Sequence, residues 1–184
     1  MMAEAPTRRQ SVRLERAAYH EAGHAVAAAL FGCRFGMVAL YPDAESESAI
    51  IGPLQIDLLK CAFPPGQPER LLQVLTILWA GTAAETQLTG RRVAPESDPD
   101  RKTVEYFLAR LIERGVTIPD GWDRRPRLDA HALLRQPKQG AAVELLASTL
   151  LNEHVIGHFT ARSIISEAMR ATVLVYSNGG SHAA

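Results

Sequence analysis

The chain has 184 residues, 47% of them hydrophobic, and its twenty basic side chains balance twenty acidic ones. This length and composition suit one globular domain with a real core, and a chain without net charge has no general reason to bind nucleic acid or an anionic membrane. The first residues lack the apolar stretch of a signal peptide, and no apolar run approaches the ~20 residues that span a bilayer. We therefore expect a cytoplasmic protein without a membrane span.

The pattern of polar and apolar residues predicts a mainly helical domain with a small β-sheet over residues 11–175, between loose tails at residues 1–10 and 176–184. Two short apolar runs flank a polar turn within residues 35–54 and predict a hairpin. The stretch HVIGH, residues 154–158, also places two histidines four apart, but its glycine favours a turn.

Apolar residues at helical spacing predict five helices, at residues 11–31, 69–88, 98–115, 141–153 and 160–175. Gly32 and Gly90 follow the first two helices and Gly115 ends the third, because glycine can adopt the left-handed conformation that ends a helix. Thr160 is the expected N-cap of the last helix. The segment between the third and fourth helices, residues 116–139, is the least regular part of the chain.

Two histidines lie four residues apart in the stretch HEAGH of the first helix. Positions four apart share one helical face, so His20 and His24 can offer imidazole nitrogens to one metal ion, and Zn²⁺ suits such ligands. Zinc lowers the pKa of a bound water to about 7, and Glu21, one helical step from His20, is placed to accept its proton as a general base. Gly23 keeps this helix slim, which allows another element to pack closely against it.

A core helix whose two histidines are simply hydrogen-bonded to the protein is the alternative interpretation, because HExxH alone is not specific. A catalytic zinc site needs a third protein ligand. The longer motif HExxHxxGxxH is absent, since Ala27 and Leu30 stand where it requires glycine and histidine. A glutamate or aspartate from a later helix therefore remains as the third ligand.

Four segments, in order along the chain, resemble the FtsH-type metallopeptidases, which are the protease domains of ATP-dependent membrane proteases. AYHEAGHAVAA is similar to the zinc helix of that family, and ESDPDRKT is similar to its segment SNDLxxAT. Softer matches are LWAGTAAETQLTG, similar to the helix AGRAAEE…G, and residues 143–169, similar to the closing helix pair. The resemblance covers most of residues 17–170 and implies a helical bundle that carries an HExxH zinc helix.

The resemblance also implies a ligand set, because Asp98 falls on the aspartate that is the third zinc ligand of the family, beside His20 and His24. An aspartate before a proline at a helix start is also a common N-cap, and one carboxylate can serve both purposes. Glu85 either orients a zinc-binding histidine or is an exposed residue near the end of its helix. An edge strand of the family binds extended substrate, and residues 46–54 are the candidate here.

The chain also departs from the family. It shows neither the ATPase module nor the membrane anchors, it has no GxxxxGK[ST] phosphate-binding motif, and residues 116–139 do not resemble the family. We therefore expect a zinc metallopeptidase that hydrolyses a polypeptide substrate with a zinc-activated water, without ATP-driven processivity. The alternative is a catalytically silent zinc-binding regulatory or interaction module. Either protein could act as a homo-oligomer or with a separate ATPase.

Overall fold

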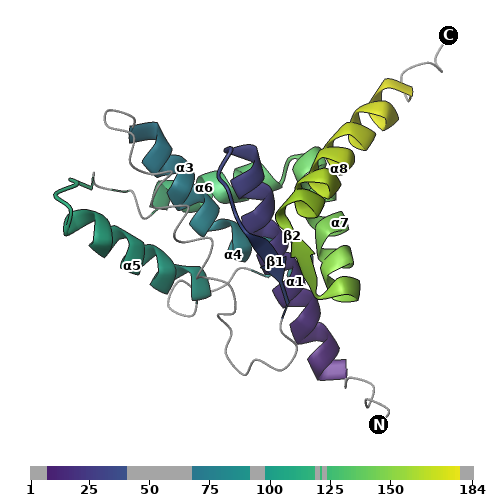
Figure 1. Cartoon of the computed structure of the whole chain (residues 1–184), viewed down its shortest axis with the longest axis horizontal. Helices are drawn as coiled ribbons and strands as arrows, with labels where there is room; N and C mark the ends of the chain where they lie inside the picture. Colours follow the sequence, from purple (N-terminus) through teal and green to yellow (C-terminus); the bar gives the residue numbers. More distant parts are fainter. Residues whose placement is uncertain (1–7, 41–67, 92–97, 119–120, 122–123, 179–184) are drawn as a thin grey trace.

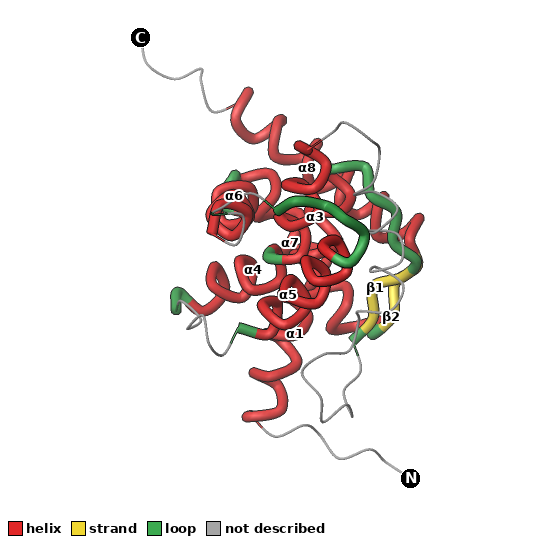
Figure 2. The backbone as a smooth tube through the Cα atoms, turned by 90° about the vertical axis from the view of Figure 1, so that its left-hand side faces the viewer, coloured by secondary structure: helices red, strands yellow, loops and turns green. Residues whose placement is uncertain are grey.

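A computed structural model describes residues 8–40, 68–91, 98–118, 121 and 124–178. Within these residues the fold consists of helices and one small sheet (Figure 1, Figure 2). The helices are α1 (Arg8–Leu30), α3 (Pro68–Leu78), α4 (Ala80–Thr89), α5 (Pro99–Ile112), α6 (Arg124–Leu134), α7 (Pro137–Glu153) and α8 (His158–Asn178), and the strands are β1 (Met37–Ala39) and β2 (Val155–Gly157). The mainly helical fold with a small sheet that the sequence predicts is confirmed.

Helix α1 is the central element, since it packs against α4 and α3 and also against α7 and α8. Small buried residues make this possible, among them Ala18, Ala22 and Gly23. A Cβ atom on Gly23 would collide with the backbone of Ala80 and come within 2.7 Å of the Ala84 Cβ. The backbones of α1 and α4 therefore approach each other more closely than two ordinary side chains would allow.

The apolar core joins α1 to the helices on both of its sides and to the small sheet. Val26 of α1, Leu75 of α3, Leu146 and Leu150 of α7 and Ile156 of β2 are all fully buried. Burial of each such side chain contributes about 1.5–3 kcal/mol to stability. None of the described helices combines the length with the apolar character that a bilayer-spanning helix needs.

The prediction of a single helix over residues 69–88 is wrong, because the structure has two helices, α3 and α4, that meet at Trp79. The predicted end is confirmed: Gly90 caps α4 in the left-handed conformation, with φ of 66°. The break leaves backbone N–H and C=O groups at the junction without helical partners. Two of these groups take part in the candidate site described below.

Two further expectations are corrected. Residues 116–139 were expected to be irregular, but they contain α6, whose Pro126 stands in the first turn, where proline is tolerated. Residues 154–158 do not form only a turn, because β2 pairs antiparallel with β1 and places Gly157 opposite Met37. A three-residue strand leaves no periodicity in the sequence, and its partner lies more than a hundred residues away.

The ends of several elements also differ from the expectations. Helix α8 begins at His158, so Thr160 lies inside the helix and does not cap it. Helix α1 begins at Arg8, within the predicted N-terminal tail. The second run of the predicted hairpin and the candidate substrate strand, residues 46–54, lie outside the described residues.

Candidate metal centre

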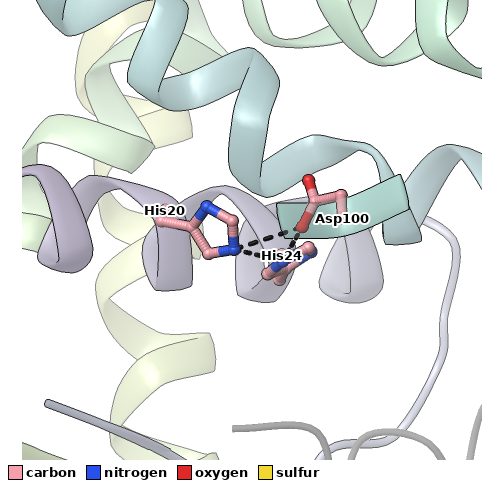
Figure 3. Close-up of side chains that lie close together, drawn as sticks. All are labelled: His20, His24 and Asp100. Carbon is pink, nitrogen blue, oxygen red and sulfur yellow. Dashed lines mark hydrogen bonds and ion pairs between the residues drawn. The ribbon is translucent and has the colours of Figure 1, made fainter. Parts of the chain in front are cut away.

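Three side chains from two helices converge on one point (Figure 3). His20 and His24 project from one face of α1, and Asp100 comes from the first turn of α5. The two Nε2 atoms are 3.1 Å apart, and each lies 3.2 Å from Oδ1 of Asp100. The Asp100 residue is 4% exposed, and the two histidine side chains are nearly as well buried.

Outer hydrogen bonds determine which imidazole nitrogen faces this point. The Nδ1 atom of His24 lies 2.8 Å from the carbonyl oxygen of Ile77, and Nδ1 of His20 lies 2.9 Å from Oε1 of Glu85. Both partners accept hydrogen bonds, so each neutral imidazole carries its hydrogen on Nδ1 and its lone pair on Nε2. With Oδ1 of Asp100, three electron-pair donors then face one another, and only a cation can satisfy all three.

The spacing of these three atoms suits a metal ion. Ligand bonds of ~2.0–2.1 Å at the tetrahedral angle separate neighbouring ligand atoms by about 3.3 Å, and nitrogen with carboxylate oxygen is a ligand set that Zn²⁺ takes. The observed separations of 3.1 and 3.2 Å are close to that value. The residues therefore fit a zinc ion bound through His20, His24 and Asp100.

The electrostatics of the site also favour positive charge. Burial by itself lowers the pKa of His20 and of His24, but the Asp100 carboxylate outweighs it and raises both pKa values. Burial raises the pKa of Asp100, and the two imidazoles reverse this and lower the pKa of that carboxyl strongly. The group therefore stabilises a cation at its centre, whether a proton on each imidazole or a metal ion.

The junction between α3 and α4 supplies backbone partners to the site. The carbonyl oxygen of Ile77, at the end of α3, accepts the hydrogen bond from His24. The N–H of Thr82, in the first turn of α4, donates to Oδ2 of Asp100 over 2.8 Å. An uninterrupted helix would engage both groups internally. The break at Trp79 thus leaves one acceptor for His24 and one donor for Asp100.

Gly81 lies directly against the two imidazoles. A Cβ atom at this position would be 2.5 Å from Nε2 of His24 and 2.6 Å from Nε2 of His20. No residue with a side chain fits there unless a histidine moves. The start of α4 therefore covers one side of the group with bare backbone.

Glu85 connects the site to an arginine. Its Oε1 accepts from His20, and its Oε2 accepts from Nε and Nη2 of Arg16 at 3.0 and 2.7 Å. Burial raises the pKa of Glu85, but His20 and Arg16 outweigh it and lower the pKa. Of the two roles that the sequence left open for Glu85, the structure shows the one that orients a histidine, since the residue is only 7% exposed.

Asp98, the ligand implied by the family resemblance, is not among the three side chains that the structure brings together. It is the N-cap of α5: its Oδ1 accepts from the N–H of Asp100 at 3.1 Å and from the hydroxyl of Thr82 at 2.5 Å. Burial is the main reason that the pKa of Asp98 is raised. Its geometry matches the N-cap alternative, and Asp100 occupies the place expected of the third ligand.

The sequence contained a signal for this exchange of roles. Pro99 stands between the two aspartates, and proline favours the first position of a helix. The residue before it is then the N-cap, whose carboxylate turns back onto its own helix, whereas Asp100 is one position further and is free to point outward.

Glu21 follows His20 on α1 and is half-buried. Burial raises the pKa of its carboxyl, while the nearby His20 and His24 act in the opposite direction. Within the described part of the chain, no hydrogen bond or ion pair engages its carboxylate. Glu21 therefore lies close enough to the group to interact electrostatically with both imidazoles.

Neither a protein-family model nor a curated protein matches the sequence. The resemblance described in the sequence analysis is therefore an expectation drawn from the sequence motifs alone.

Proposed function

We propose that the chain is a zinc-dependent metallopeptidase, with zinc held by His20, His24 and Asp100. The observation that carries the proposal is the convergence of two imidazole Nε2 atoms and one carboxylate oxygen at separations of 3.1–3.2 Å. Glu21 beside the group supplies the base that hydrolysis requires. The choice of a peptide bond as the substrate rests on the resemblance of the HEAGH helix to the FtsH-type zinc helix.

A zinc ion at this point would polarise the substrate carbonyl and lower the pKa of a water molecule to about 7. Glu21 accepts a proton from the attacking water and passes it to the nitrogen of the leaving amine. Glu85 and the Ile77 carbonyl hold the two imidazoles in the required tautomer and orientation. Thr82 holds the Asp100 carboxylate by its second oxygen.

A second candidate function is a zinc-binding module that does not turn over substrate. The enclosure of the group favours it, since the His20 and His24 side chains expose only 13% and 12% of their surface. Structural zinc sites are closed, whereas catalytic sites keep an open coordination position. The presence of Glu21 beside His20 favours the peptidase, because a structural site has no use for a neighbouring base.

The substitution Glu21→Gln separates the two functions. Glutamine has nearly the same shape as glutamate but cannot accept the proton, so we expect zinc content to stay at the wild-type level and the cleavage rate of casein to fall by about 10²–10⁴-fold. Glu15→Gln, at an exposed position of the same helix, is the matched control and should leave both quantities unchanged.

Cleavage should also stop on chelation and return when zinc is added. A wild-type protein that holds zinc but cleaves no unfolded substrate would support the silent module. Undiminished cleavage by the Glu21→Gln variant would rule out the role given to this residue. A wild-type protein that binds no zinc would overturn both candidate functions.

A further inference from the structure

Helix α6 lies in the segment that resembles no part of the family, yet it packs against both α3 and α4. It brings Arg127 toward the start of α5. Nη2 of Arg127 lies 3.9 Å from Oδ2 of Asp98, and its guanidinium lies over the ring of Trp79, 5.6 Å from the centroid. Arg127 therefore lies between the α3–α4 junction and the N-cap of α5, the two backbone segments that shape the site.

Asp98 needs such a partner. Its side chain is fully buried, and Oδ2 makes no hydrogen bond within the described part of the chain. A buried carboxylate oxygen without compensation is costly, and removal of a charge that offsets it costs more than loss of an exposed pair. Because the side chain of Arg127 is 25% exposed, solvent partly hydrates its guanidinium, which lowers the cost of holding this charge at the site.

Hydrogen bonds to Thr82 couple the position of the Asp98 side chain to that of Asp100. The Thr82 hydroxyl donates to Asp98, and the Thr82 N–H donates to Oδ2 of Asp100. The N–H of Asp100 in turn donates to Asp98. These three bonds form a closed ring that leaves Oδ1 of Asp100 directed at the imidazoles. A displacement of Asp98 must therefore disturb the hydrogen bonds that aim the third ligand.

From this arrangement we infer that Arg127 is a positioning residue: it holds the Asp98 carboxylate, and through Asp98 and Thr82 it aims Asp100 at the metal. The inference rests on the proposed metal binding by His20, His24 and Asp100. It gives α6 a role at the site, although α6 contributes no ligand.

The test is metal affinity, measured by competition with a chromophoric chelator for Zn²⁺ and by absorption of the Co²⁺-loaded protein. We expect Arg127→Ala to weaken zinc binding by about tenfold, the lower end of the range for residues that support a ligand. Arg127→Lys should restore most of the affinity and the Co²⁺ spectrum, since it keeps the charge. Arg125→Ala, on the same helix and paired with Asp129 instead, is the control and should bind as the wild type does.

A double-mutant cycle tests whether Arg127 acts on zinc affinity through Asp98. In an Asp98→Asn background, Arg127→Ala should cause no further loss of affinity, because the charge on which Arg127 acts is gone. If Arg127→Ala does not fold, Arg127→Met keeps a long unbranched side chain without the charge and should show the same loss.

Zinc binding of wild-type strength in Arg127→Met would overturn the inference. An equal loss of zinc affinity from Arg127→Ala in the wild-type and Asp98→Asn backgrounds would also overturn it, because Arg127 would then not act through Asp98. A wild-type chain that binds neither Zn²⁺ nor Co²⁺ would instead overturn the proposed function, which distinguishes the two failures.

Discussion

At the scale of single residues, the candidate site depends on how two helices bring the side chains of His20, His24 and Asp100 together. His20 and His24 lie on one continuous helix, and helical geometry fixes their relative position. Asp100 lies on another helix, seventy-six residues after His24, so its approach to α1 depends on packing that no local pattern encodes. The sequence offers two aspartates around a proline, and although Pro99 marks Asp98 as the N-cap, only the fold shows that Asp100 lies beside the two imidazoles.

Substitution of each aspartate by asparagine tests this distinction. Asp100→Asn removes the charge whose Oδ1 lies 3.2 Å from both imidazoles, so we expect the larger loss of zinc affinity for this variant. Asp98→Asn keeps an N-cap residue and should bind zinc at least tenfold more tightly than Asp100→Asn. Isothermal titration of the two variants measures the difference. The reverse order of affinities would restore Asp98 as the ligand.

Glu85 allows a second test at this scale. Glu85→Gln loses the charge that holds Nδ1 of His20 and that pairs with Arg16. Loss of such a partner typically costs 10–100-fold in metal affinity, and we expect a decrease in that range. Glu105→Gln, which breaks an exposed pair with Arg101 on α5, is the control. Equal zinc affinity in the two variants would mean that Glu85 does not orient the histidine.

At the scale of elements, the helices with clear apolar periodicity were predicted, and the junctions between elements were missed. Residues 69–88 are apolar nearly all round, so their pattern gives no sign of the break at Trp79. The break depends on partners from elsewhere in the chain, the His24 imidazole and the Asp100 carboxylate. Strand β2 was missed for a similar reason, since a strand of three residues is defined by its pairing with β1.

Gly81 at the start of α4 shows how element packing and the site depend on each other. In Gly81→Ala, the new Cβ would overlap Nε2 of both histidines, so we expect loss of zinc binding with helical content retained. Gly140→Ala in α7 is the matched control, because the nearest atom to its Cβ would be at 3.5 Å. That variant should keep its zinc and gain about 0.5–1 kcal/mol in stability. Circular dichroism with zinc analysis measures both effects, and full zinc occupancy in Gly81→Ala would contradict this geometry.

At the scale of the whole molecule, the metal would join the centre of the fold to its edge. Helix α1 packs against helices on both sides, whereas α5 makes its main contacts with α3 and α4 (Figure 1). The ligands come from α1 and α5, so an ion bound between them links a well-packed helix to a less supported one. The unfolded chain cannot hold the three ligand atoms together. Zinc should therefore bind the folded state far more tightly than the unfolded state.

Thermal unfolding with and without metal tests this coupling. A ligand at one hundred times its Kd stabilises the folded state by about 2.7 kcal/mol. For a chain of this size, that corresponds to a rise in Tm of about 5–10 °C. We expect Zn²⁺ to produce such a rise in the wild type and chelator to abolish it.

Two controls identify the source of the rise. His24→Ala lacks a ligand and should show little response to zinc. Mg²⁺ prefers an octahedral set of oxygen atoms and should not stabilise a site built from two imidazoles and one carboxylate. An equal rise with Mg²⁺, or an undiminished rise in His24→Ala, would place the stabilising ion elsewhere. A rise confined to zinc and dependent on His24 would mean that the residues of HEAGH and the first turn of α5 stabilise the fold through the ion that they share.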